Sequence, residues 1–177
     1  MKIRVATSDD VAAVGACADR AFLQFTPPAR HTAEGHDDDL LEQIRRENLH
    51  VISEGSDPTI VGYISLLPIA DHMFVESIAV LPEHQNKGLG TRLLAFAEQE
   101  AARRGLNSVR LFTKQKTTDG FVFYKYRGYR ETDRCDSDGF PRVFYSKDIS
   151  PNHLLGCGGG EAGLTGPGFG SGCGLGV

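Results

Sequence analysis

The sequence has no apolar run long enough to cross a membrane and no excess of basic residues. Its 177 residues include 19 Lys and Arg against 23 Asp and Glu, which gives a formal net charge of -4. Nucleic-acid binding needs a concentrated basic face, so this balance argues against nucleic acid as the main ligand. The opening "MKIRVATSDD" lacks the apolar core of a signal peptide. We therefore expect a cytoplasmic protein with no membrane partner.

Cysteine pairs are also missing. The four cysteines, Cys17, Cys135, Cys157 and Cys173, are widely spaced and form no C-x-x-C motif. The histidines are scattered without the spacing of metal ligands. Neither a disulfide framework nor a zinc site is indicated, and we expect no metal.

The length fits a single domain that can bury its own core. Apolar periodicity and turn residues predict the order β-α-α-β-β-β-α-β-α-β-β over residues 1–149, an α/β (α+β) fold with a mixed sheet and helices on its faces. Strands are expected at 2–6, 49–53, 59–69, 72–81, 107–113, 129–136 and 142–149. Helices are expected from 7 to about 25, from about 37, over 90–104 and over 118–127.

The last segment, 150–177, has a different composition. From Gly156 to Val177 about half of the residues are glycine, which buries too little apolar surface to offset the entropy of ordering. We predict a glycine-rich disordered tail. The alternative is metal capture by Cys157, Cys173 and His153, which the long glycine spacer disfavours.

The stretch "QNKGLG" leads from a predicted strand directly into a predicted helix. A helix N-terminus offers free N–H groups and a partial positive charge, so the stretch is typical of a pyrophosphate site. The P-loop pattern is absent, because Lys87 precedes its glycine. The dinucleotide pattern fails at its third glycine, where Leu93 stands. A plain strand-to-helix turn remains the alternative.

Two motifs carry a family resemblance. "IAVLPEHQNKGLGTRLL" resembles the coenzyme A signature Gln/Arg-x-x-Gly-x-Gly/Ala of the GNAT superfamily of acetyl-CoA-dependent N-acetyltransferases. "VFYKYRGYRE" is similar to its second signature, here Phe123, Tyr124, Gly128 and Tyr129. The resemblance covers about residues 1–149, has the predicted order of elements, and excludes the tail.

The resemblance implies acetyl-CoA as co-substrate. The pyrophosphate would be held by N–H groups of the first signature, and the pantetheine arm would pair with a strand edge that splays from its neighbour. Thr117 stands where the family often has Asn, which puts one coenzyme contact in doubt. The implied coenzyme residues are Ile78, Ala79, Val80, Gln85, Asn86, Lys87, Gly88, Leu89, Gly90, Thr91, Thr117 and Tyr124.

Tyr124 would protonate the departing thiolate, and its alternative is aromatic packing. Alternation in "HMFVESIAV" places Phe74, Glu76, Ile78 and Val80 on one strand face. Family members often carry their base at positions matching Phe74 or Glu76, so Glu76 is the candidate base. A structural salt bridge is its alternative.

The resemblance implies an acyltransferase enzyme that moves an acetyl group from acetyl-CoA to a primary amine, of a small molecule or a peptide, by direct transfer in a ternary complex. The acceptor is not identified. The alternative is a non-catalytic acyl-CoA-binding sensor, because Phe74, Phe112 and Thr117 stand where polar working residues are common. "DDD" at 37–39 fits an acceptor pocket or favourable first-turn acids. A homodimer also stays open.

Overall fold

The computed structural model describes residues 1–22, 36–54, 59–114, 118–137 and 140–149. Thr117 and the predicted tail therefore lie outside the described residues, and the division into 1–149 and 150–177 stays a prediction. The elements are β1 (Lys2–Val5), η1 (Ser8–Asp10), α1 (Val11–Phe22), α2 (His36–Arg45), β2 (Leu49–Ser53), β3 (Ile60–Ile69), β4 (His72–Val80), η3 (Pro82–His84), α3 (Leu89–Arg103), β5 (Ser108–Lys114), α4 (Thr118–Tyr126), β6 (Arg130–Ser137) and β7 (Phe140–Asp148). The predicted order of helices and strands is confirmed.

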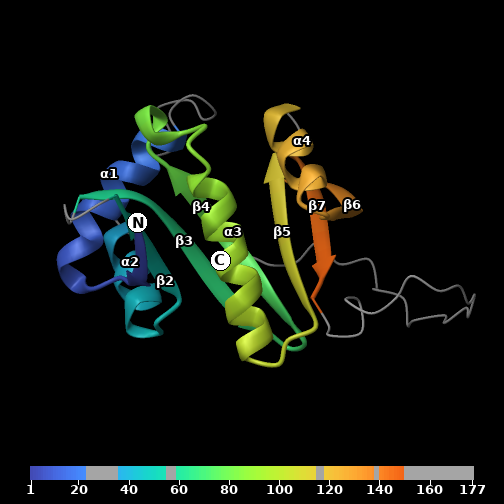
Figure 1. The fold of residues 1–177 in the computed structure, drawn as a ribbon, viewed down its shortest axis with the longest axis horizontal. Coiled ribbons are helices and arrows are strands. Elements are labelled where there is room, and N and C mark those ends of the chain that lie inside the picture. Colours follow the sequence, from blue (N-terminus) through green and yellow to red (C-terminus); the bar gives the residue numbers. More distant parts are fainter. Residues whose placement is uncertain (23–35, 55–58, 115–117, 138–139, 150–177) are drawn as a thin grey trace, which may run out of the picture.

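The seven strands form one mixed sheet in the order β1-β2-β3-β4-β5-β7-β6. Every neighbouring pair is antiparallel except β4 and β5, which are parallel. β4 and β5 are paired at one end only, and Figure 1 shows them diverging toward their carboxyl ends. The sheet is thus split in the middle, beside the start of α3.

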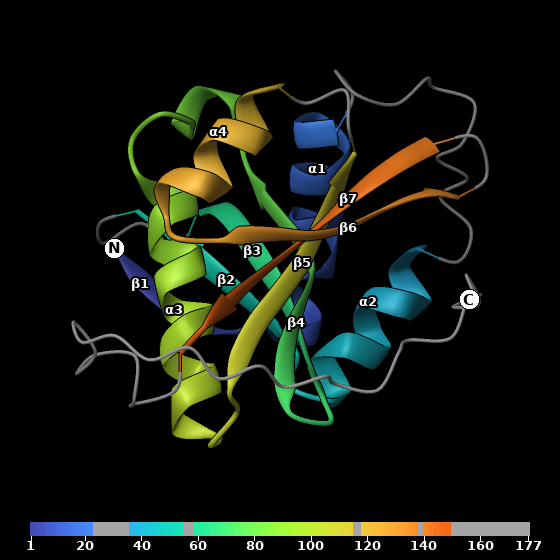
Figure 2. The same cartoon turned by 90° about the vertical axis from the view of Figure 1, so that its right-hand side faces the viewer.

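Helices cover the two faces of the sheet, and Figure 2 shows α3 and α4 on one side with α1 and α2 on the other. One core lies under α3 and includes Leu93, Leu94 and Val75. The second lies under α1 and α2 and includes Val14, Leu40 and Tyr63. Within the described residues, no helix combines the length and the hydrophobicity that crossing a membrane requires. The cytoplasmic location stays a prediction.

A β-bulge at Glu76 changes which face the second half of β4 presents. Ser65 of β3 pairs with Ser77, whereas Leu66 pairs with Val75, so Glu76 is the extra residue. Beyond the bulge Ile78 and Val80 pack against the core under α3, and Ala79 joins the core under α1. The predicted alternation, with Phe74, Glu76, Ile78 and Val80 on one face, is therefore wrong beyond Glu76.

Candidate active site

The turn before α3 has the backbone shape of an anion site. Gly88 is the N-cap residue with φ 80°, and Asn86 also lies in the left-handed region with φ 59°. Glycine tolerates this conformation without strain, and asparagine tolerates it better than most residues. The first helical bond runs from the Arg92 N–H to the Gly88 carbonyl oxygen at 3.1 Å. The N–H groups of Leu89 to Thr91 thus precede the helical bonds, as in other helix N-termini.

The two glycines of the motif have different structural reasons. A Cβ on Gly88 would meet open space, so only its positive φ requires glycine. A Cβ on Gly90 would lie 3.2 Å from the Phe123 ring, so Gly90 allows α4 to approach α3 closely. The need for glycine at position 90 therefore comes from the packing of α4 on α3.

Gln85 ties the turn to the end of β4. Its side-chain Nε2 donates to the Val80 carbonyl oxygen at 3.0 Å. Its backbone N–H, which the resemblance assigned to the pyrophosphate, donates to the Pro82 carbonyl oxygen at 3.2 Å. Lys87 is exposed at the rim, whereas the Leu89 side chain is buried in the core, which leaves its backbone to face a ligand.

The split between β4 and β5 lies next to this turn. The two strands are paired from His72–Val75 to Ser108–Leu111, and within the described residues their pairing runs no further. The edge of β4 that carries Ile78 to Val80 therefore faces the split without a strand of this sheet beside it. An unpaired edge offers its N–H and C=O groups to an extended ligand.

Arg127 connects α4 with the first turn of α3. Its Nη2 donates to the Thr91 Oγ1, and its Nη1 donates to the Phe123 carbonyl oxygen at 3.2 Å. The guanidinium carbon lies 3.9 Å from the centroid of the Phe123 ring. A positive charge therefore stands beside the helix N-terminus, where an anion is favoured.

The side chain of Tyr124, from α4, lies in the core under α3. Its side chain is 9% exposed, and its ring lies 5.6 Å from that of Tyr145 and 6.0 Å from that of Tyr129. Burial raises the pKa of Tyr124 to about 12, and the neighbouring Tyr145 hydroxyl adds to the shift. The phenol is therefore protonated at neutral pH and suited to donate a proton. Its surroundings also fit the alternative of aromatic packing.

Glu76 lies on the bulge with two neutral partners. Its Oε2 accepts a hydrogen bond from Gln43 Nε2 of α2 at 2.8 Å and another from Ser65 Oγ at 3.0 Å. No ion pair involving Glu76 occurs in the part of the chain that the structure describes, so the salt-bridge alternative gains no support there. The residue is exposed, and a substrate can reach its carboxylate.

The other predicted residues have less specific surroundings. Asp38 and Asp39 are exposed in the first turn of α2. The described residues include no group of three His, Cys, Asp or Glu side chains that could hold a metal ion, and the absence of a metal stays a prediction. A depression of about 270 Å³ on β6 and β7 contains none of the predicted site residues.

Three residues near the site were not predicted from the sequence. Gln43 and Ser65 hold Glu76, and Arg127 holds the first turn of α3. Gln43 carries no sequence signal, because its contact with Glu76 joins residues 33 positions apart. Arg127 lies inside the second signature, where its charge between aromatic residues was a signal that could have been used.

Comparison with known proteins shows which family the chain belongs to. The model of the Acetyltransferase (GNAT) family matches residues 19–129, well over half of the chain. The chain belongs to the GNAT acetyltransferase family. Both signatures lie within the matched GNAT segment, together with the strand that carries Glu76.

Curated relatives share part of this segment. A spermidine N(1)-acetyltransferase from Thermoplasma acidophilum is 32% identical over 103 residues, which cover 56% of this chain and 64% of the relative. An aminoalkylphosphonate N-acetyltransferase from Salmonella typhimurium is 34% identical over 58 residues, 33% of this chain and 38% of the relative. The GNAT chain thus spans less than two thirds of the length of these curated relatives.

Solved GNAT structures share the fold. The PaiA N-acetyltransferase of Thermoplasma acidophilum, in complex with coenzyme A, has a TM-score of 0.72 at 22% identity and covers 83% of this chain and 98% of its own. YncA of Salmonella typhimurium, solved with acetyl-CoA, has a TM-score of 0.70 at 21% identity and covers 85% and 94%. The mixed sheet and its helices are therefore those of GNAT proteins.

Proposed function

We propose that this GNAT chain transfers the acetyl group of acetyl-CoA to a primary amine by direct transfer in a ternary complex. The observation that carries the proposal is the juxtaposition of the turn at Gly88 with the unpaired edge of β4. The turn suits a pyrophosphate, and the edge suits an extended, amide-containing arm. Relatives that are named as amine acetyltransferases support an amine acceptor.

The residues around the split supply the proton transfers. Glu76 takes a proton from the ammonium form of the amine, directly or through water, and the neutral nitrogen then bonds to the acetyl carbon. The nitrogen loses its second proton to water after this bond has formed. A backbone N–H of β4 stabilises the negative charge that develops on the carbonyl oxygen. The carbon–sulfur bond breaks, and Tyr124 gives its proton to the thiolate and regains one from water. The products are an N-acetylated amine and the free thiol of coenzyme A.

Titration of acetyl-CoA into the full chain tests the first half of the proposal. We expect micromolar affinity in the unaltered chain and its loss in Gly88→Glu, because a carboxylate at the helix N-terminus repels the pyrophosphate. Gly88→Asn is the matched control, since asparagine tolerates positive φ without adding charge. Unchanged affinity in Gly88→Glu would show that the turn is not the coenzyme site.

A thiol-release assay with a panel of amines tests the second half. Turnover that falls roughly 10²-fold in Glu76→Gln with unchanged acetyl-CoA affinity would support the base role. Glu47→Gln is a control for removing a charge from exposed surface, and it should leave both quantities unchanged. Tight binding of acetyl-CoA without turnover of any amine would instead favour the non-catalytic sensor.

A further inference from the structure

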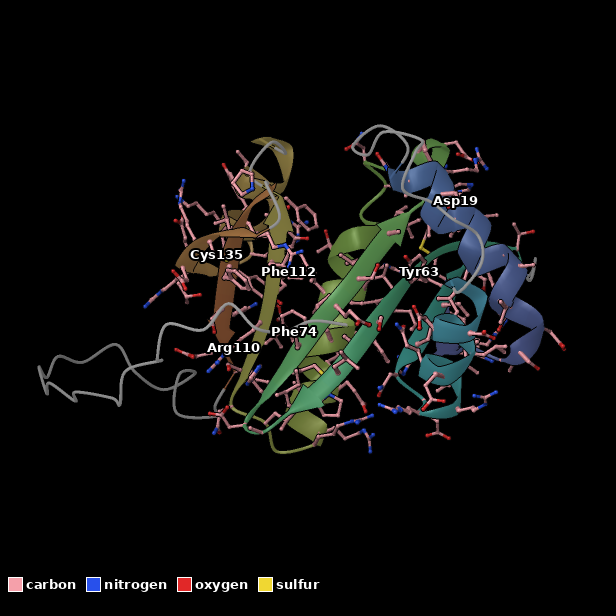
Figure 3. All side chains as sticks on the ribbon, turned by 180° about the vertical axis from the view of Figure 1, so that it is seen from behind. Asp19, Tyr63, Phe74, Arg110, Phe112 and Cys135 are labelled. Carbon is pink, nitrogen blue, oxygen red and sulfur yellow. The ribbon has the colours of Figure 1, made fainter. Side chains whose placement is uncertain are left out.

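Three phenylalanines form a continuous surface on the half of the sheet next to the split. Phe74 of β4, Phe112 of β5 and Phe144 of β7 lie on neighbouring strands, and each is half-buried. The ring centroids of Phe74 and Phe112 are 6.1 Å apart, and those of Phe112 and Phe144 are 5.8 Å apart. We call these three residues the aromatic row. Figure 3 shows Phe74 and Phe112 beside α1 and α2, on the face that these helices occupy.

The two helices on this face lie mainly over β2, β3 and β4. α1 packs against β3 and β4, and α2 packs against β2. In Figure 3 the ribbon of β5 and β7 lies to the left of both helices and is not covered by them. The aromatic row therefore runs from the edge of the helical layer toward β7, and its rings offer an apolar face to a ligand.

A cation lies on the aromatic row. The guanidinium carbon of Arg142, from β7, is 5.0 Å from the centroid of the Phe112 ring. The side chain is half-buried, and in the described part of the chain no carboxylate pairs with it. A partly desolvated guanidinium over an aromatic ring is stabilised by that ring and binds a carboxylate strongly when one arrives. The part of the aromatic row at Phe112 thus favours an anionic group.

The candidate base lies at the Phe74 end of the aromatic row. Glu76 is two residues after Phe74, and both Gln43 and Ser65 donate to the same oxygen, Oε2. Neighbouring strands are about 4.8 Å apart, and Arg142 lies two residues along β7 from Phe144, which is opposite Phe112. Because β4 and β5 also diverge beyond Val75, the backbones of Glu76 and Arg142 are more than two strand spacings apart, on the order of 12–15 Å. A small molecule can span the distance between the two side chains.

We propose that the acceptor is a primary amine with an aromatic or apolar body and an anionic group, such as a carboxylate, at its far end. The amine lies at Glu76, the body lies on the aromatic row, and the anion pairs with Arg142. A polyamine is disfavoured, because its second ammonium group would lie beside the Arg142 cation. This inference rests on the proposed acetyl transfer and adds the class of the acceptor.

Three probe amines test the inference on the full chain with acetyl-CoA. They are 4-(aminomethyl)benzoate, its neutral analogue 4-(aminomethyl)benzamide, and spermidine. The measured quantity is kcat/KM from thiol release. We expect the benzoate to exceed the benzamide by at least ~tenfold, the size expected for one charge-assisted pair, and spermidine to be the poorest acceptor.

Variants of Arg142 assign the preference to its charge. Arg142→Met keeps the apolar stem and should bring the ratio of benzoate to benzamide close to one, whereas Arg142→Lys should retain part of it. Arg134→Met is the matched control from the same hairpin. Arg134 is registered with Val143, whose side chain lies in the opposite core, so its removal should leave the ratio unchanged.

Acetyl-CoA titration on every variant separates the two proposals. If acetyl-CoA binds but the benzoate and the benzamide are used equally, or only spermidine is used, the acceptor class is overturned and acetyl transfer stands. If acetyl-CoA binds and none of the three amines is used, the acceptor class is overturned, and the wider amine panel decides between acetyl transfer and the sensor. A preference that survives Arg142→Met would also overturn the inference. If acetyl-CoA does not bind the unaltered, folded chain, the proposed function itself fails.

Discussion

Tyr124 is a buried phenol, and its burial determines which way it can move a proton. The pKa of Tyr124 is raised to about 12 by burial, with Tyr145 adding to the shift, so the hydroxyl keeps its proton across the working pH range. We expect Tyr124→Phe to lower kcat by roughly 10²-fold, because the thiolate loses its proton donor. Acetyl-CoA affinity should stay within about threefold, because the phenylalanine ring keeps the packing. Thiol release and calorimetric titration measure the two effects.

The helix that carries Tyr124 also offers its control. Tyr126 is 87% exposed, and Tyr126→Phe should change neither kcat nor affinity. The alkaline limb of the pH profile should also be the same in the unaltered chain and in Tyr126→Phe. If kcat in Tyr124→Phe stayed within about twofold of the unaltered value, Tyr124 would be a packing residue and the thiolate would take its proton from water.

Asp10 shows how one carboxylate stabilises the start of the chain. It accepts two hydrogen bonds from Arg4, at 2.6 and 2.9 Å, and one from the Thr7 N–H at 2.8 Å. The bonds from Arg4, followed by those from Thr7, lower the pKa of Asp10 to about 2, against a desolvation that raises it. The stabilisation is therefore present above the ordinary pKa of 3.8 and is lost as the pH falls toward 2.

Asp10→Asn should thus lower the free energy of unfolding at pH 7 by roughly 1–2 kcal/mol, a value reduced because Arg4 is partly exposed. The difference from the unaltered chain should shrink between pH 4 and pH 2, as measured by denaturant unfolding over this range. Asp9→Asn, at the exposed neighbouring position, is the control. An equal loss at every pH would mean that the Asp10 charge does not contribute.

At the scale of elements, local signals predicted most of the fold. The glycine after α3, Gly105 with φ 71°, ends that helix where the sequence indicated, and Thr7 precedes the first helical turn as expected. The bulge at Glu76 escaped prediction, because it exists only in the register between β3 and β4. Strict alternation along β4 therefore gave the wrong face for Ile78 and Val80. The error matters chemically, because the bulge sets the position of the candidate base.

Arg127 links α3 to α4, since it donates hydrogen bonds to the Thr91 side chain of α3 and to the Phe123 carbonyl oxygen of α4. We expect Arg127→Met to weaken acetyl-CoA binding by roughly tenfold, because the first turn of α3 loses a charge and a fixed neighbour. Arg127→Lys should recover part of the affinity. Arg130→Met, at an exposed position on β6, is the control.

A merely structural role for Arg127 can be recognised in the same experiments. It would lower the unfolding temperature without changing the affinity of the folded fraction. The expected result is instead a weaker affinity for acetyl-CoA, measured well below the unfolding temperature, with kcat at saturating acetyl-CoA within about threefold of the unaltered chain.

At the scale of the whole molecule, the sequence could not predict which distant segments meet. The last two predicted strands are confirmed and pair with each other, and β7, the later of the two, lies beside β5. This order brings Phe144 to Phe112 and so completes the aromatic row. The contact of Gln43 with Glu76 likewise depends on α2 packing over the sheet. Such contacts follow from tertiary packing, which a single sequence encodes only weakly.

The boundary after Ile149 is the last feature that can be tested. The Ile149 N–H donates to the Asn107 carbonyl oxygen at 3.0 Å, and its side chain packs against the core under α3. The composition of 150–177 predicts no such contribution. A chain of residues 1–149 should therefore unfold within about 2 °C of the full chain, and its acetyl-CoA affinity should stay within about twofold.

A chain of residues 1–148 is the matched comparison. It also loses Ile149, whose partial burial contributes about 1 kcal/mol, so it should unfold a few degrees lower. Calorimetric unfolding and acetyl-CoA titration on the two chains locate the boundary to one residue. If the 1–149 chain unfolded as low as the 1–148 chain, or bound acetyl-CoA several times more weakly than the full chain, the glycine-rich segment would be part of the acetyltransferase domain.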